Sequence, residues 1–346
     1  MKKRILLVID VEGWTFDILA SKLKKNLNNK YDIDILPGSF FDGNMVKLFL
    51  FSSKYDLIHF MWRGYLSLLN NVNMDRYITS MGFEKKEFYN KFINNKIVTA
   101  TVCDHLYLNE DEYWRTEEIL KYVKSYFVTS KKLDEIYVNV NKEKKYGIIN
   151  DFIDLNLFKS VIRKTPNNKD KFIIGWVGNS NFIGPNGEKD LKGVNNILKP
   201  AIKQLIDEGY NVELKLADSA EKVISNNDMP SFYKNIDIYV CTSSSEGTPM
   251  PVLEAMASGV PVISTDVGIV QEAFGKEQKM FILPERTIVA LKEKIKSIIT
   301  APQIYEVLSK ENLESVKKFS IESVSKKYVD FFEYNFKNDL SRRKDD

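Results

Sequence analysis

Short apolar runs alternate with amphipathic stretches along the chain of 346 residues. Runs rich in Val, Ile, Leu and Phe favour buried strands, whereas apolar positions repeating every ~3.6 residues favour helices. The alternation predicts an α/β protein with parallel sheets. In the first half the expected strands are residues 5–10, 32–36, 56–61, 96–103, 125–130 and 146–150. In the second half they are residues 172–179, 211–217, 237–243, 260–265 and 280–284.

Helical patterns fill the segments between these strands. Residues 16–29 predict an amphipathic helix after the first strand, and residues 195–209 predict one that Gly209 ends. The tail, residues 319–346, is helical in pattern, and Asp and Glu among its basic residues favour packing over lying on a membrane surface. The aromatic face of the tail consists of Phe319, Tyr328, Phe331, Phe332 and Phe336.

Composition narrows the classes of function. The net charge of +3 is small, so we expect no nucleic-acid partner. The two cysteines lie in apolar runs, which predicts buried, reduced thiols, and no Cys/His cluster has metal-ligand spacing. The apolar run at the N-terminus, ILLVI, is too short for a signal peptide, and no run approaches the ~20 apolar residues of a membrane span. We therefore expect a cytoplasmic protein.

Residues 243–268, SSSEGTPMPVLEAMASGVPVISTDVG, carry most of the chemical information. Their pattern predicts a loop, a short helix and a strand, following the strand at 237–243. Pro251 suits the first turn of the helix, and Gly259 suits the position just past its end. Because ligands of parallel sheets bind at the carboxyl ends of the strands, the free N–H groups of residues 244–250 and the helix dipole favour a phosphate there.

Two carboxylates flank this loop. Glu246 follows the strand and could accept hydrogen bonds from sugar hydroxyls, and Glu254, expected in the first helical turn, could accept from two ribose hydroxyls. In the alternative interpretation Glu254 only complements the helix dipole and Glu246 is a solvated loop charge. The whole constellation within one strand–helix–strand unit favours the binding interpretation.

This segment resembles the donor-binding signature of retaining glycosyltransferases with the GT-B fold, family 4 type. That signature has two glutamates eight positions apart and then a Gly-Val-Pro-Val strand; here it reads EGTPMPVLE and SGVPVISTDVG. The resemblance implies two Rossmann-like domains whose parallel sheets face a central cleft. Residues 1–150 would bind the acceptor and residues 151–318 the nucleotide-sugar donor. Residues 319–346 would form a helix that crosses back onto the N-terminal domain, and a polar tail.

The resemblance also implies the donor site. Lys192, in a Lys-Gly pair, would neutralise charge on the leaving diphosphate, while Asn179 stands where the family usually has Arg. Gly13 would let the backbone approach the diphosphate. The donor-binding residues implied are Gly13, Asn179, Lys192, Glu246, Gly247, Thr248, Pro249, Met250 and Glu254.

The N-terminal domain would supply the remaining site residues. His59 and His105 each end a strand-like run, so we expect both at the carboxyl edge of the sheet. The resemblance implies a histidine at the end of the fourth strand that contacts the donor sugar. Alignment on the T-V-x-D pattern places Cys103 at that position, whereas the residue type favours His105. We choose His105, with Asp104 as a neighbour that could orient it. Trp14, His59 and Asp104 are candidates for the acceptor or the cleft, and Trp14 could stack on a sugar ring. The catalytic set is Glu246, His105 and Lys192.

The expected reaction is retaining, metal-independent transfer of a hexosyl group from a nucleotide-diphosphate sugar to an acceptor hydroxyl. The resemblance implies no cofactor; a UDP-sugar is preferred over a GDP-sugar as co-substrate. The partner would be a bacterial glycan, protein or lipid-linked acceptor, reached from the cytoplasm or from the inner face of the cell membrane. The alternatives are a GT-B nucleotide-sugar epimerase, a non-catalytic glycosyltransferase-like partner protein and, less favoured, a glycoside hydrolase.

Overall fold

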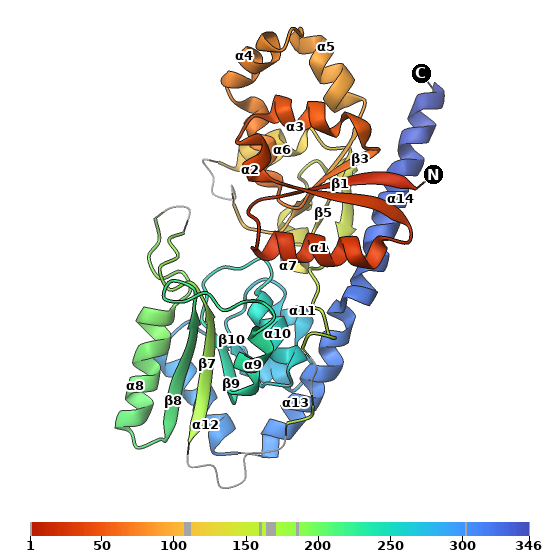
Figure 1. The fold of residues 1–346 in the computed structure, drawn as a ribbon. Helices are drawn as coiled ribbons and strands as arrows, with labels where there is room; N and C mark the ends of the chain where they lie inside the picture. Colours follow the sequence, from red (N-terminus) through yellow and green to blue (C-terminus); the bar gives the residue numbers. More distant parts are fainter. Residues whose placement is uncertain are drawn as a thin grey trace. The chain divides into compact units, whose positions relative to one another are not determined.

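The computed structural model describes residues 2–106, 112–158, 161–163, 171–184, 187–301 and 303–345. The chain forms two compact units (Figure 1). The first unit combines residues 1–152 with residues 321–346, and the second consists of residues 153–320. Within the described ranges, no helix has both the length and the apolar character needed to cross a membrane.

The first unit is built on a parallel sheet with the strand order β2-β1-β3-β4-β5-β6. Every strand predicted in the first half of the chain is confirmed within a few residues at each end. The strands are β1 (Lys3–Ile9), β2 (Tyr31–Pro37), β3 (Leu57–Phe60), β4 (Ile97–Val102), β5 (Ser125–Val128) and β6 (Lys145–Ile148).

Helices cover both faces of this sheet, and the predicted helix after the first strand is confirmed as α1. The α-helices are α1 (Thr15–Leu27), α2 (Gly38–Phe41), α3 (Met45–Phe51), α4 (Asn73–Ser80), α5 (Lys85–Tyr89), α6 (Tyr113–Leu120), α7 (Lys131–Ile136) and α14 (Ile321–Asp345). Shorter helical turns are η1 (Ser52–Lys54), η2 (Arg63–Asn70), η3 (Asn90–Asn94) and η4 (Lys142–Lys144).

Successive residues of a strand face opposite sides of the sheet, and this alternation explains where His59 lies. In β3, Ile58 and Phe60 join the core beneath α3 and η2, whereas His59 points to the other face, which α14 covers. His59 is fully buried, stacked on Phe127 with ring centroids 5.5 Å apart. His59 thus lies near the carboxyl end of β3, as expected, but its buried side chain is not accessible to an acceptor.

The aromatic face of α14 closes this side of the first unit. Tyr328, Phe331 and Phe332 are buried against the sheet. Polar contacts fix the register of the helix: Ser125 Oγ donates to Asn335 Oδ1 over 2.7 Å. Phe319, which the sequence placed on the same face, instead ends η7 (Val316–Phe319) and packs in the core of the second unit.

The second unit has a smaller parallel sheet with the order β10-β9-β7-β8. Its strands are β7 (Phe172–Gly178), β8 (Val212–Asp218), β9 (Ile238–Cys241) and β10 (Val262–Ser264). Its α-helices are α8 (Lys199–Asp207), α9 (Met229–Lys234), α10 (Met250–Ala257), α11 (Val270–Ala273), α12 (Ile288–Ile299) and α13 (Gln303–Ser315). Shorter turns are η5 (Val194–Leu198), η6 (Gln278–Phe281) and η7.

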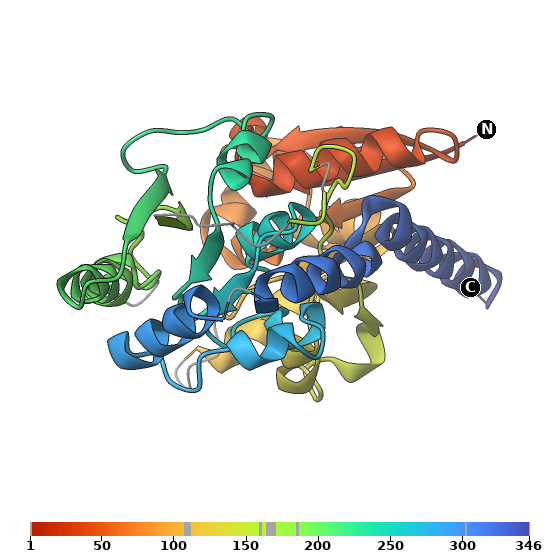
Figure 2. The same ribbon diagram turned by 90° about the horizontal axis from the view of Figure 1, so that it is seen from below.

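The two faces of the second sheet have separate cores. Ile174 and Trp176 of β7 face α8 and α12, which lie together along one side of the sheet (Figures 1 and 2). Ile173 and Val177 face the other core, formed with α9 and α10. Helix α8 follows η5, and Gly209, at φ +89°, stands just past the helix as predicted.

The predicted strand at residues 280–284 is wrong. Residues 278–281 form η6, and Ile282 makes only an isolated bridge to Ser264 of β10. A buried side chain takes the place of a neighbouring strand: Gln278 Nε2 donates to the Val262 carbonyl over 2.6 Å, and its Oε1 accepts from the Val262 N–H over 3.3 Å. The amide thus satisfies backbone groups at the edge of β10 without a ladder.

The burial of His59 predicts a specific pH dependence of stability. Burial lowers the pKa of His59 to about 3 from 6.5, so the folded protein keeps the ring neutral between Thr99 and Thr101. The unfolded chain binds this proton below pH ~6.5, so stability present above pH 6.5 is lost as the pH falls towards 3. The slope from this one site approaches ~1.4 kcal/mol per pH unit.

We expect His59→Gln, whose side chain does not titrate, to flatten the pH dependence of the free energy of unfolding between pH 6.5 and 4.5. Urea unfolding of both chains at several pH values measures the difference, and His105 and the carboxylates cancel because both chains contain them. Identical slopes would contradict a neutral, buried His59.

Candidate active site

The strand order of the second sheet indicates a ligand site at the carboxyl ends of β7 and β9. β7 lies between β8 and β9, so the connections after β7 and β9 run to opposite sides. In such sheets a crevice opens outside the carboxyl ends of the two strands. Asn179 follows β7, and residues 242–246 follow β9, so two of the predicted donor loops meet there.

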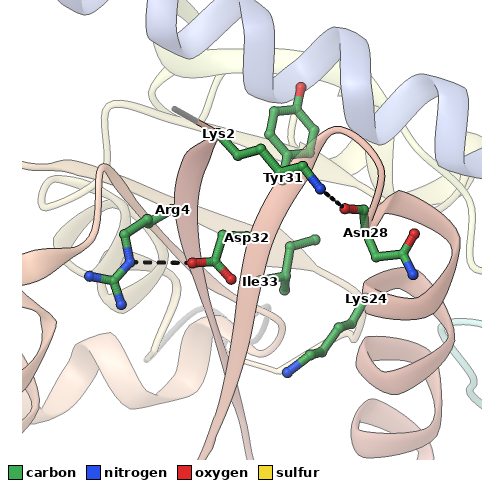
Figure 3. Close-up of a pocket in the computed structure, with 7 residues that line it drawn as sticks. All are labelled: Lys2, Arg4, Lys24, Asn28, Tyr31, Asp32 and Ile33. Atoms are coloured by element: carbon green, nitrogen blue, oxygen red, sulfur yellow. Dashed lines mark hydrogen bonds and ion pairs between the residues drawn. The ribbon is translucent and has the colours of Figure 1, made fainter.

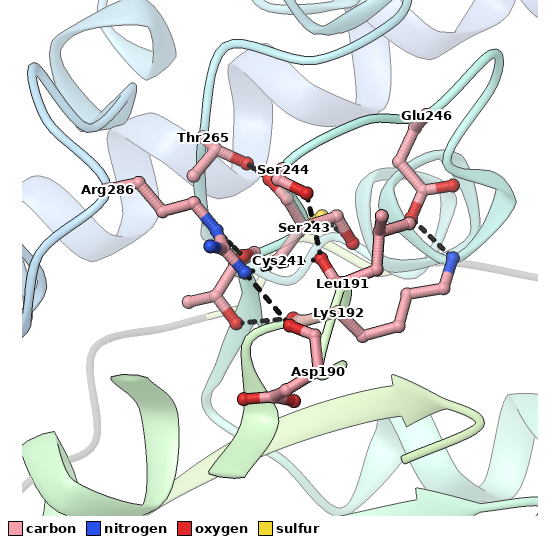
Figure 4. Close-up of polar contacts among 10 residues, drawn as sticks. Asp190, Leu191, Lys192, Cys241, Ser243, Ser244, Glu246, Thr265 and Arg286 are labelled. Atoms are coloured by element: carbon pink, nitrogen blue, oxygen red, sulfur yellow. Dashed lines mark hydrogen bonds and ion pairs between the residues drawn. The ribbon is translucent and has the colours of Figure 1, made fainter. Parts of the chain in front are cut away.

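An ion pair connects the two principal residues of the predicted donor site. Lys192 Nζ lies 2.6 Å from Glu246 Oε1 (Figure 4). The side chains are 23% and 16% exposed, so both charges are largely withdrawn from water. The Lys192 ammonium also lies 5.5 Å from the ring centroid of Phe182. The structure therefore brings Lys192 and Glu246 together.

The loop before α10 and the start of that helix follow Glu246 directly. Pro251 lies in its first turn, and Gly259, at φ +68°, stands just past its end, as predicted. In the loop before it, the hydroxyl oxygen of Thr248 is buried and has no hydrogen-bond partner within the described parts of the chain. Burying a hydroxyl unsatisfied costs ~1–3 kcal/mol, so this oxygen is suited to a ligand.

Glu254 lies in the second turn of α10 and not in the first turn as predicted, since the helix begins at Met250. A tyrosine that the sequence reasoning missed holds its carboxylate: the Tyr233 hydroxyl donates to Glu254 Oε2 over 2.7 Å. Tyr233 is fully buried, and burial, with the charge of Glu254, raises its pKa far above the usual value. A neutral phenol therefore orients Glu254.

Gly193 explains why a glycine follows Lys192. Its φ is +70°, and a Cβ there would lie 2.5 Å from the Thr242 carbonyl oxygen and 2.9 Å from Arg286 Nη2. Thr242 Oγ1 donates to the Lys192 carbonyl over 2.8 Å. The loop that carries Lys192 thus lies directly on the end of β9, which only glycine permits.

The loop after β7 contains no cation at Asn179. Asn179 is exposed, and its Oδ1 accepts from the Asn181 N–H over 2.9 Å, a local turn. Asp218, at the end of β8, holds the loop by accepting from the Ser180 N–H over 3.0 Å. Burial alone would raise the pKa of Asp218, but hydrogen bonds from Ser180 and Ala220 bring it below the usual range. Asp218 was not predicted.

In the first unit, the loop after β1 matches its expected shape. Gly13 has φ +78°, and its N–H donates to Asp17 Oδ2 over 2.8 Å, which fixes the start of α1. Trp14 precedes the helix and is 64% exposed. An exposed indole at a loop tip is available for stacking, as the sequence suggested.

Asp104 has partners other than the predicted one. Its carboxylate accepts from Arg63 Nη1 over 2.7 Å, from Trp62 Nε1 over 2.9 Å and from the Leu106 N–H over 3.0 Å. Burial would raise the pKa of Asp104, but the Arg63 charge and these hydrogen bonds lower it below its usual range. Asp104 therefore anchors the fully buried Arg63 and does not orient His105.

Cys103 and His105 both follow the end of β4. Cys103 is 8% exposed, and burial raises the pKa of its thiol well above the usual value, so the thiol stays protonated. His105 is only partly buried. We retain His105 as the candidate for the catalytic histidine.

A cavity of about 380 Å³ lies elsewhere, at the amino edge of the first sheet (Figure 3). Its basic side chains already have protein partners: Arg4 and Lys24 form ion pairs with Asp32 and Asp34 over 3.6 Å, and Lys2 donates to the Asn28 carbonyl. The predicted site residues lie at the carboxyl edges instead. The cavity is lined by Lys2, Arg4, Lys24, Asn28, Tyr31, Asp32 and Ile33.

Metal ligands are not gathered at either edge. Among the side chains that the structure describes, no group of at least three His, Cys, Asp or Glu residues is placed to hold a metal ion.

Two parallel-stranded Rossmann-like units, with this arrangement at the end of β9, define the class as GT-B. Residues 192–314 match the family model described as glycosyl transferases group 1. This match, which covers most of the second unit, supports the resemblance found in the sequence.

Two curated proteins of Staphylococcus aureus are similar in sequence. Protein CapJ is 27% identical over 222 residues, which cover 57% of this chain and 52% of CapJ. The capsular polysaccharide biosynthesis glycosyltransferase CapM is 28% identical over 172 residues, 44% of this chain and 43% of CapM. The chain thus spans about half the length of the curated relatives it matches.

Among solved structures, Anabaena HepE in complex with UDP and glucose is similar in fold. Its TM-score is 0.66 at 13% sequence identity, and the match covers 96% of this chain and 100% of HepE.

The contact at Gly193 predicts a stability difference between two glycine variants. Gly193→Ala adds a Cβ that collides with the Thr242 carbonyl, on top of the strain at positive φ, so we expect a loss of ~2–3 kcal/mol. Gly209→Ala is the matched control, since Gly209 also has positive φ but its Cβ would meet nothing within 4 Å. It should lose only ~1 kcal/mol. Urea unfolding measures both, and equal losses would contradict the close approach at Gly193.

Proposed function

We propose that the protein transfers a sugar from a nucleotide-diphosphate sugar to an acceptor hydroxyl with retention of configuration. The observation that carries the proposal is the Lys192–Glu246 ion pair beside the start of α10. The pair brings a cation and a carboxylate together in front of a helix start. That combination suits a ligand with both a diphosphate and a hydroxylated ring.

Each part of this arrangement has a role in the proposed reaction. Lys192 and the N–H groups before α10 stabilise the negative charge that grows on the leaving diphosphate. Glu246 accepts hydrogen bonds from the sugar, and Glu254, oriented by Tyr233, accepts from the ribose. When the donor binds, its phosphate and sugar replace the contact that Lys192 and Glu246 make with each other.

Retention is proposed on the strength of the family resemblance. The acceptor oxygen bonds to the anomeric carbon on the face from which the diphosphate oxygen leaves. A donor phosphate oxygen takes the acceptor proton, so the protein needs neither a metal nor a further cofactor. The protein then contributes positioning and electrostatic stabilisation.

We propose a UDP-sugar in preference to a GDP-sugar, supported by the UDP and glucose in the HepE structure. CapM is named for capsular polysaccharide synthesis, which supports a bacterial glycan, glycoprotein or glycolipid as the acceptor. Trp14 of the first unit is a candidate for an acceptor contact, and His105 is the candidate for the catalytic histidine. A peripheral position at the inner face of the cell membrane belongs to the proposal and rests on the sequence expectation alone.

Rival functions remain distinguishable by experiment. An epimerase would convert a sugar nucleotide without any acceptor, and a non-catalytic partner protein would turn over none. The absence of a cation at Asn179 is the observation that favours the second rival. Incubation with UDP-, GDP- and ADP-sugars, with and without acceptor glycans, separates these functions.

Glu246→Gln should lower sugar transfer at least ~100-fold with the fold intact, because the amide keeps the shape of the side chain but loses the charged acceptor. Transfer is measured as release of nucleoside diphosphate, and folding by circular dichroism. Glu221→Gln, at an exposed position of the same unit, is the control and should keep full activity. Wild-type transfer by Glu246→Gln would refute the assignment.

Glu254→Ala should weaken binding of the free nucleoside diphosphate by ~10–100-fold, since the ribose loses its acceptor. Tyr233→Phe should weaken it in the same direction but less, because Glu254 loses only its orienting hydroxyl. Isothermal titration calorimetry with UDP measures both. If Glu254→Ala binds UDP as the wild type does, Glu254 does not hold the ribose.

A further inference from the structure

Arg286 connects the backbone segments that carry the two principal site residues. It lies between η6 and α12, far from both loops in sequence. Its Nε donates to the Thr242 carbonyl over 2.8 Å (Figure 4). Its Nη2 donates to the carbonyls of Asp190 over 3.1 Å and Leu191 over 3.2 Å.

These carbonyls belong to the segments that position Lys192 and Glu246. Asp190 and Leu191 immediately precede Lys192, and Thr242 begins the loop that leads from β9 to Glu246. Other hydrogen bonds join the same segments: the Ser244 N–H donates to the Leu191 carbonyl over 2.9 Å. The guanidinium thus lies where the two loops touch, and Arg286 Nη2 fills the space that a Cβ on Gly193 would need.

The chemistry of guanidinium suits this place. Its planar fork donates from fixed directions, so one side chain can bind carbonyls of two separate segments, whereas a lysine ammonium acts as a single point. Within the described residues, no carboxylate pairs with Arg286. Its hydrogen bonds go to main-chain carbonyls, so Arg286 acts on the positions of the two loops.

We propose that Arg286 is a positioning residue of the donor site: it holds the Lys192 loop against the end of β9, so that Lys192 meets the diphosphate. This inference rests on the proposed function for the identity of the ligand. Arg286 acts through Lys192, and its removal matters to binding only while Lys192 is present.

The second unit contains a matched control. Arg163 also donates to backbone carbonyls, those of Ser258, Ile236 and Tyr233, at distances of 3.1, 2.7 and 2.6 Å. Ile236 precedes β9, so Arg163 clamps the amino end of the strand whose carboxyl end Arg286 clamps. Loss of either guanidinium leaves carbonyls unsatisfied, but Arg163 bonds neither of the segments that carry Lys192 and Glu246.

The test is a double-mutant cycle on nucleotide affinity. The wild type, Arg286→Ala, Lys192→Met and the double variant are titrated with UDP, and with GDP and ADP, by calorimetry; unfolding of each without ligand is recorded separately. We expect Arg286→Ala and Lys192→Met each to weaken UDP binding about tenfold. The double variant should bind within about twofold of Lys192→Met alone, because the two changes remove the same interaction.

The control and the conservative variant complete the design. Arg163→Lys should lower the melting temperature and leave the UDP affinity unchanged. Arg286→Lys, which keeps the charge but not the fork, should weaken binding like Arg286→Ala and serves in its place if the alanine variant does not fold.

Two results would overturn the positioning role: UDP affinity unchanged in the Arg286 variants, or additive losses in the double variant. Failure of the wild type to bind UDP, GDP or ADP would instead refute the proposed function, a separate outcome.

Discussion

The contact between the Lys192 ammonium and the Glu246 carboxylate depends on the meeting of two loops that leave different strands of one parallel sheet. The cost of withdrawing these two charges from water offsets much of their attraction, so the pair alone does not hold the loops together. The loops are held by backbone contacts instead: Gly193 closes on Thr242, and Thr242 Oγ1 bonds the Lys192 carbonyl. The ion pair follows from the backbone arrangement, and its charges remain available for exchange with a ligand.

Much of the fold follows directly from local patterns in the chain. Buried strands of a parallel sheet are apolar on both faces, so apolar runs such as residues 5–10 and 172–179 are recognised as strands from the sequence. Helix boundaries are equally local signals. Pro251 lies in the first turn of α10, and Gly259 and Gly209 stand just past helix ends, because of their own φ preferences. Glu246 and Lys192 were found because a known motif contains them, although 54 residues separate them.

The errors arise where the decisive partner is distant in sequence. His59 occupies a strand as expected, but α14, more than 250 residues later, turns its face of the sheet into the interior. At residues 280–284 the cause is local instead: the segment has the composition of a strand, but the side chain of nearby Gln278 bonds the backbone at the edge of β10. Arg286 has no motif or spacing to mark it, since its acceptors are main-chain carbonyls that every residue type provides.

The placement of α14 has a consequence for the order in which the chain matures during synthesis. The ribosome releases residues 153–320 before residues 321–345, yet the latter cover the face of the first sheet that holds His59 and Phe127. The second unit can therefore complete its core while the first still exposes an aromatic surface to the cell. The first unit is translated first but completes its core last. Nascent chains arrested before residue 321 therefore expose the aromatic face of the first sheet to chaperones.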